Sequence, residues 1–288
     1  ALNATGLNRG TLRVANTVGV VRCSEVAVLV AVPASAAFTN QSRVLFDGTT
    51  NVTVVAPNSG GSVGGCVDMQ PHVADGSSIV FDGGNCTTES PSGSASAIGL
   101  GSVVNGTSFI RVARGGSAVA VTHSADTSHR AHALRVAPTV QLEAGAEIIV
   151  EAGGSLRALA SAGASAAALW LEGPMAGARV HVRGAGTGVI AETTGSAAEF
   201  TDAIRVVGGT TFGASATVTI DDSASVEATG RLASCVHLDR PMPAGSRVLV
   251  TGGARLVSSA STTTARGVWV GAAAWSAGSA LEVRNVTL

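Results

Sequence analysis

The chain has 288 residues and a net charge of -1, with 18 Arg, no Lys and 19 Asp and Glu. A balance this close to neutrality excludes the electrostatic attraction that basic chains have for nucleic acid or acidic membranes. Charged residues make up 13% and apolar residues 45%, which excludes disorder caused by low hydrophobicity and high charge. The 37 glycines and the low aromatic content of 3% favour closely packed strands.

A short apolar pattern recurs eight times and predicts the first strand of a repeat. Counted from Val28 to Val268, its period is about 34 residues. A proline follows five of the copies and marks the end of the strand, where a missing N–H does least harm. The copies are Ala27–Val30, Cys66–Met69, Ala97–Leu100, Ala133–Val136, Ala168–Leu171, Ala203–Val206, Cys235–Leu238 and Gly267–Val270.

A second pattern follows ten to fourteen residues later and alternates with a period of two before it breaks at Gly or Asp. A third and weaker strand closes some copies, as in Ser155–Ala158 and Ala254–Val257. The second strands are predicted at Arg43–Gly48, Ser78–Gly84, Glu147–Val150, Arg179–Val182, Thr217–Ile220, Arg247–Gly253 and Leu281–Val283.

Short strands repeated at this period predict an all-β fold, a right-handed parallel β-helix (solenoid) of about eight coils. Residues 1–288 then form a single solenoid segment. The alternative is a β-sandwich built from hairpins. Regular copies and few two-residue hairpin turns count against it.

Aligning the copies places one outward residue of each first strand in a single column. The last five members alternate cations and aromatic rings and predict a ligand-binding face, because Arg and Trp on a rigid sheet suit glycan or sulfate recognition. The alternative is that long loops fold over this face and bury the tryptophans. The column contains Leu29, Asp68, Gly99, Arg135, Trp170, Arg205, His237 and Trp269.

Other groups with possible chemistry give weaker signals. The loop at 122–132 contains His123, Asp126, His129 and His132, but their spacing matches no firm metal signature, and a solvated polar loop is favoured.

Two further motifs point to enzymes and are not favoured. The pair Asp221–Asp222 follows the strand Thr217–Ile220. Because adjacent residues on a strand point to opposite faces, these two alone cannot act as a glycosidase pair. The serine motif Gly60–Gly64 lacks the strand and helix that a nucleophile elbow needs. We predict no catalytic residue, metal or cofactor.

Six of the nine asparagines lie in Asn-X-Ser/Thr sequons, an excess that predicts a glycosylated, secreted chain. No stretch is long enough to cross a bilayer: the nearest, Val26–Phe38, is interrupted by Pro33. We interpret the chain as a piece of a longer exported protein. The sequons lie at Asn3, Asn40, Asn51, Asn85, Asn105 and Asn285.

Four cysteines without CxxC spacing suit disulfides better than zinc. Cys66 and Cys235 share one slot five coils apart, about 24 Å, and cannot pair. Two bridges are feasible, Cys66 with Cys86 or Cys23 with Cys66. Cys235 then stays free or meets a partner outside the segment.

The runs Val28–Pro33, Ser42–Thr53 and Ala244–Val250 resemble the large dispersed-gene-family surface proteins of trypanosomatids. The similarity covers most of the chain but lies in repeat texture, not in an active-site motif. It implies a pectin-lyase-like β-helical ectodomain segment of a long glycosylated membrane protein that acts in adhesion to host cells or matrix. The modest cysteine count and the lack of a membrane span or an epidermal-growth-factor-like module depart from the family.

These observations together predict a non-enzymatic ectodomain segment of a cell-surface or extracellular glycoprotein. The expected partners are host glycans or extracellular proteins, not nucleic acid, and the segment itself does not contact the membrane. The alternatives are a β-helical polysaccharide lyase or glycosidase and a passive spacer.

Overall fold

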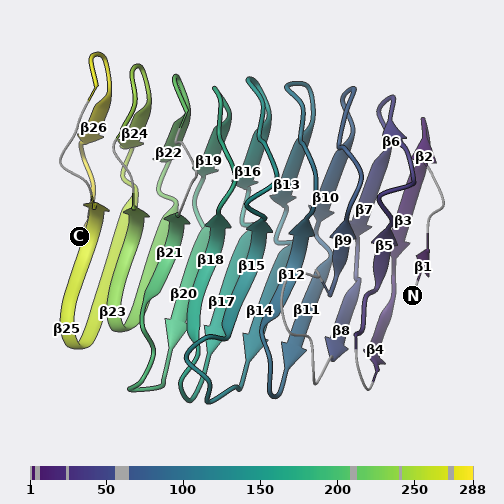
Figure 1. Cartoon of the computed structure of the whole chain (residues 1–288), viewed down its shortest axis with the longest axis horizontal. Coiled ribbons are helices and arrows are strands. Elements are labelled where there is room, and N and C mark those ends of the chain that lie inside the picture. The colour runs from purple at the N-terminus through teal and green to yellow at the C-terminus, as the bar shows by residue number, and fades with distance from the viewer. Residues whose placement is uncertain are drawn as a thin grey trace.

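The protein is a parallel β-solenoid (Figure 1). A computed structural model describes residues 2–3, 7–23, 26–55, 65–207, 213–239, 242–271 and 276–287. Within these ranges every element is a β-strand, and every pairing between the strands is parallel. The all-β solenoid prediction is therefore confirmed, and the hairpin-built sandwich is excluded.

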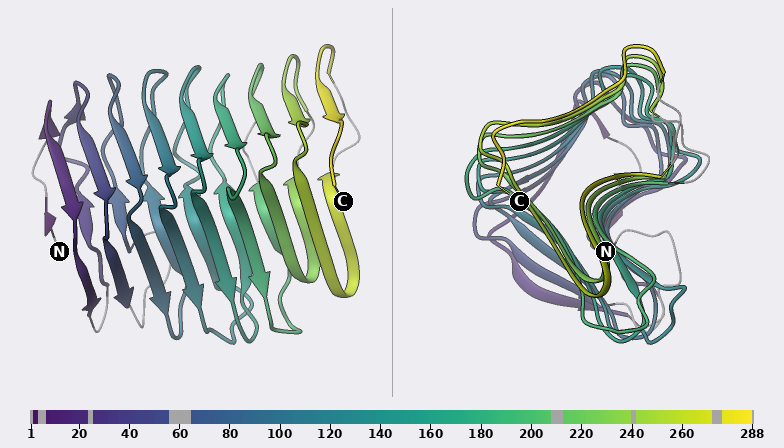
Figure 2. Two further views of the ribbon diagram at one scale, coloured as in Figure 1. Left: turned by 180° about the vertical axis from the view of Figure 1, so that it is seen from behind. Right: turned by 90° about the vertical axis from the view of Figure 1, so that its left-hand side faces the viewer.

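Each coil contributes one strand to each of three rows, which form three walls around one core (Figure 2). The first row contains β1 (Leu2–Asn3), β5 (Val30–Val32), β9 (Val67–Met69), β12 (Ala95–Leu100), β15 (Arg130–Val136), β18 (Ser165–Leu171) and β21 (Thr201–Val206). The second row contains β3 (Thr11–Ala15), β7 (Arg43–Asp47), β10 (Ser78–Asp82), β13 (Phe109–Ala113), β16 (Glu147–Glu151), β19 (Arg179–Arg183), β22 (Thr217–Asp221), β24 (Arg247–Val250) and β26 (Ala280–Val283).

The third row contains β4 (Val18–Arg22), β8 (Asn51–Val55), β11 (Asn85–Ser90), β14 (Ser117–Thr122), β17 (Ser155–Ala160) and β20 (Gly188–Thr193). Two long strands, β23 (Ser225–Leu238) and β25 (Arg255–Val270), turn back on themselves, so each supplies the third row and then the first row (Figure 1). A short pair, β2 (Leu7–Asn8) with β6 (Phe38–Thr39), lies beside them.

The core is a set of columns of identical or similar apolar side chains, one per coil. Alternate residues of each strand point inward because side chains change face at every residue. In the second row, Phe46 and Phe81 of neighbouring coils stack with ring centroids 4.4 Å apart. Each fully buried side chain of this size adds about 1.5–3 kcal/mol of hydrophobic stabilisation. The column beside them contains Val44, Ile79, Ile110, Ile148, Val180, Val218 and Val248.

The observed register confirms most of the predicted repeat and corrects its first copy. The first strand pairs Val30 with Val67 and Ala31 with Asp68, so Ala31 stands where Leu29 was predicted. The apolar run at 26–32 is long enough to pair with β9 in two registers that differ by two residues. Only the observed pairing decides between these registers. The third strand is present in every coil from β4 to β25, although its weak pattern predicted it only in some.

A disulfide joins Cys66 and Cys86 across the core, with 6.0 Å between their Cα atoms. This pairing was one of the two predicted and is confirmed. Cys23 is an exposed free thiol and Cys235 a buried one. A disulfide indicates an oxidising compartment, as outside the cell. The described ranges include no helix that is long and apolar enough to cross a membrane.

Candidate functional site: the outer strip of the first row

The predicted column on the first row exists as aligned from Asp68 to Trp269, and only its first member, Leu29, is replaced by Ala31. Arg135 pairs in register with Trp170, Trp170 with Arg205, Arg205 with His237, and His237 with Trp269. A second outward column runs beside it. In these strands two consecutive residues, such as Ala168 and Leu169, both enter the core, so the residues on either side of them, such as Ala167 and Trp170, both point outward. Its members are Ser96, His132, Ala167, Asp202, Ser234 and Arg266. We call the two columns, with Arg130 and Phe200 that contact them, the outer strip.

Trp170 lies at the centre of the strip and is only 2% exposed. Its ring centroid is 4.8 Å from that of His132 and 5.3 Å from that of Phe200. The guanidinium carbons of Arg130 and Arg205 lie 4.9 and 5.3 Å from the same ring centroid. Cations placed over a tryptophan face are attracted by its quadrupole, so the cluster is a cation–aromatic stack.

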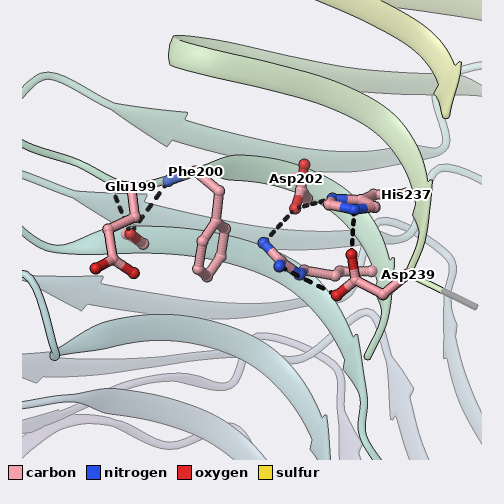
Figure 3. A network of polar contacts seen from close by, with 7 residues as sticks. Glu199, Phe200, Asp202, His237 and Asp239 are labelled. Carbon is pink, nitrogen blue, oxygen red and sulfur yellow. Dashed lines mark hydrogen bonds and ion pairs between the residues drawn. The ribbon is translucent and has the colours of Figure 1, made fainter. Parts of the chain in front are cut away.

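Phe200 covers this stack from the segment that precedes β21. Ser165 holds that segment in place because its hydroxyl oxygen accepts backbone N–H groups of Glu199 and Phe200 at 3.1 and 3.4 Å (Figure 3). The ring centroid of Phe200 then lies 3.9 Å from the guanidinium carbon of Arg205. The burial of Trp170 agrees with the alternative prediction, in which loops fold over this face and bury the tryptophans.

A four-residue ionic network continues the strip towards the C-terminus. Arg205 donates to the carboxylates of Asp202 at 2.9 Å and Asp239 at 3.2 Å. His237 bridges the same two carboxylates, with Nδ1 2.9 Å from Asp202 and Nε2 2.5 Å from Asp239 (Figure 3). Asp202 is 1% exposed, so one buried carboxylate faces two cations. Arg135 pairs separately with Glu172, its Nε and Nη2 donating at 3.1 and 2.8 Å.

The two histidines of the strip have opposite protonation behaviour. Burial lowers the pKa of His132 well below 6.5, and the charges of Arg135, Arg130 and Arg205 lower it further. Burial also acts to lower the pKa of His237, but its hydrogen bonds to Asp202 and Asp239 outweigh this and raise it above 6.5. The pKa of Asp239 is lowered. Burial acts to raise it, but the hydrogen bond from His237 and the charge of Arg205 outweigh burial. The shift of the His132 pKa favours the neutral imidazole, and that of His237 favours the imidazolium form between two carboxylates.

Buried polar atoms without a hydrogen-bond partner concentrate on the strip. Nine of the thirteen such side-chain atoms found in the described residues lie there. One of the nine, His237 Nε2, is in ionic contact with Asp239, which leaves eight. Each such atom costs about 1–3 kcal/mol when no partner satisfies it. The eight are Ser96 Oγ, Arg130 Nε, His132 Nδ1 and Nε2, Trp170 Nε1, Asp202 Oδ1, Arg205 Nε and Ser234 Oγ.

Of the two tryptophans of the strip, the one at its C-terminal end is accessible. Trp269 and Arg266 are both half-buried, and the guanidinium carbon of Arg266 lies 4.1 Å from the Trp269 ring centroid. The Trp269 ring also contacts His237, with centroids 3.9 Å apart. A ring and a guanidinium that share one surface can stack on a sugar and donate to its oxygens.

The chain matches no protein-family model, and it is similar to no curated protein and to no solved structure.

The histidine-rich loop does not converge on one point. His123 contacts Glu89 and Ser161, His129 contacts Ser124, and His132 lies in β15 against Trp170. Placing all of His123–His132 in a loop was therefore wrong for His132. In the part of the chain that the structure describes, no three His, Cys, Asp or Glu side chains gather as a metal site.

The remaining enzyme-like motifs lie away from the strip. Asp221 ends β22, and Asp222 follows it in the corner with a φ of 50°. Burial, and then the charge of Asp222, raise the pKa of Asp221. The serine motif Gly60–Gly64 lies outside the described residues.

The sequons fall mainly at corners and strand ends. Asn40 and Asn285 are exposed in turns, and Asn51 is exposed at the start of β8. Asn85 lies beside Asn51 on the next coil, and its side-chain oxygen accepts the Ser117 hydroxyl at 2.8 Å. Asn105 is half-buried, and its side-chain oxygen accepts bonds from its own turn. The side chain of Asn3 lies outside the described residues. Glycosylation at these sites stays a prediction.

Sequence reasoning did not place Arg130, Phe200, Asp202 or Arg266 on the strip, and it missed Asp239 beside it. Asp202 lies three residues before Arg205, and Asp239 lies two residues after His237. A carboxylate so close in sequence to each of two aligned cations, Arg205 and His237, was the signal that could have predicted the ionic network. Phe200 gave no signal, because its position depends on the path of the covering segment.

Proposed function

We propose that this chain is a non-enzymatic segment of a cell-surface glycoprotein ectodomain, which binds glycans of host cells or matrix through the outer strip. The resemblance to the dispersed-gene-family surface proteins of trypanosomatids and the six sequons support the same proposal. The disulfide agrees with an extracellular location.

The observation that carries the proposal is the half-buried Trp269 ring, with the guanidinium carbon of Arg266 4.1 Å from its centroid, at the C-terminal end of the strip. The guanidinium donates hydrogen bonds, and the ring beside it offers an apolar face. Sugar hydroxyls donate and accept, and the apolar faces of sugar rings stack on aromatic rings. A polyhydroxyl ligand is therefore the best chemical match.

An enzymatic role for the same carboxylates is less well supported. A glycosidase needs one carboxylic acid that keeps its proton until the leaving group takes it. Asp202 and Asp239 both face Arg205 and His237, and the pKa of Asp239 is lowered. An ionised Asp239 suits binding better than proton transfer.

The test is binding of the glycosylated recombinant chain to an array of neutral and acidic glycans. The double variant Arg266→Ala/Trp269→Ala removes the accessible end of the strip. Its matched control, Arg179→Ala/His181→Ala, removes one cation and one ring from the outer face of the second row. Circular dichroism and thermal melting verify that both remain folded.

We expect selective binding that is lost in the strip variant and kept in the control. Binding that survives in the strip variant would contradict the proposal. A chain that binds no glycan would indicate a spacer, and release of shortened sugars would indicate an enzyme.

A further inference from the structure

We infer that the outer strip takes an acidic glycan, sulfated or carboxylated, which lies along the solenoid axis with Arg130 and Arg266 as its two anion contacts. This inference rests on the proposed function and specifies its ligand class.

The four arginines of the strip fall into two kinds. Arg135 pairs with Glu172, and Arg205 pairs with Asp202 and Asp239. Arg130 and Arg266 form no ion pair with any carboxylate in the described residues. These two arginines therefore lack the close carboxylate partner that Arg135 and Arg205 have, although the charges of Glu172 and Glu199 act on Arg130 from farther away. The carboxylates of the ionic network face Arg205 and His237.

The two arginines without an ion pair are held in the same manner. Each lies over a tryptophan ring. The guanidinium carbon of Arg130 is 4.9 Å from the Trp170 ring centroid, and that of Arg266 is 4.1 Å from the Trp269 ring centroid. Stacking uses the face of the guanidinium and leaves its in-plane N–H groups free to donate. Those groups form the planar fork that pairs with carboxylate and sulfate oxygens.

The distance between them indicates a chain-like ligand and not a single ion. Arg130 lies on β15 and Arg266 on β25, four strand steps apart through β18, β21 and β23. At about 4.8 Å per step this is about 19 Å. Trp170, Asp202 and Ser234 lie between the two arginines and are buried, so the sugar chain passes over them from one arginine to the other.

The experiment titrates the glycosylated chain with a heparin-derived octasaccharide and with the same octasaccharide after desulfation, at low and high salt. The variants are Arg130→Gln and Arg266→Gln, which keep hydrogen-bonding capacity but remove the charge. Arg247→Gln is the matched control, since Arg247 is an exposed second-row residue without an ion pair in the described residues. Melting curves exclude a folding defect.

Loss of one charge-assisted hydrogen bond predicts a fall in affinity of about tenfold for each strip variant. We expect the sulfated octasaccharide to bind more tightly than the desulfated form, and the control to be unchanged. Equal binding of both forms, with unchanged strip variants, would overturn this inference and leave the proposed function standing. Equal losses in all three variants would also overturn it, because binding would then follow net charge alone. If neither octasaccharide nor any glycan on the array binds, the proposed function fails as well.

Discussion

Replacing Asp202 by Asn removes one negative charge from the strip and keeps the shape of the side chain. The Asp202 carboxylate is 1% exposed and lies 2.9 Å from both Arg205 Nη1 and His237 Nδ1. Removing one partner of a buried ion pair costs about 3–5 kcal/mol, because the cation that remains is buried without compensation. Arg205 keeps its bond to Asp239, so we expect a loss near the lower end of that range.

The matched control is Asp47→Asn. Asp47 pairs with Arg13, whose side chain is 62% exposed, and pairs of this kind contribute about 0–1 kcal/mol. The assay is urea denaturation followed by tryptophan fluorescence near pH 6, supported by circular dichroism. A loss in Asp202→Asn no larger than that in Asp47→Asn would refute the argument that this network stabilises the first row.

The same variant tests the pH dependence. The folded pKa of His237 is raised, so its contribution to the free energy of unfolding is complete below about 6.5 and is lost as pH rises through the folded pKa. In Asp202→Asn, the decline of stability above pH 6.5 is expected to become shallower. An unchanged slope would show that His237 does not titrate against this carboxylate.

The remaining predictions concern single groups. His132 is buried and neutral with a lowered pKa, so stability falls as pH drops below about 6.5, and His132→Leu flattens this slope in acid denaturation curves. A double Cys66→Ala/Cys86→Ala variant loses about 3 kcal/mol in urea melts, because the bridge closes a loop of 20 residues; an unchanged midpoint would contradict this. Burial raises the pKa of Cys235 to about 12, so a thiol reagent labels exposed Cys23 first, and Cys235 is labelled only after unfolding.

Much of the fold was predictable because a solenoid repeats its pattern in every coil. Second-row strands such as Arg179–Arg183 alternate apolar and polar residues so regularly that their register followed from the sequence. The start of the first row was harder. Val28 and Val30 offer the same apolar face two residues apart, and only pairing with β9 selects Val30.

The alignment of the site residues was predictable from the sequence, but the segment that covers them was not. The alignment of Trp170 with Arg205 and Trp269 depends only on strand spacing, which the repeat reveals. The burial of Trp170 depends on the segment before β21, whose path is set by bonds to Ser165 and not by any periodicity. The sequence therefore indicated which residues share a face, but not how many of them stay accessible.

The most direct test of the account is a crystal structure of the glycosylated chain with the heparin-derived octasaccharide. We expect a sugar chain along the outer strip, with acidic groups at Arg130 and Arg266 and a ring against Trp269. A sugar chain bound to the outer face of the second or third row, with the strip empty, would contradict it.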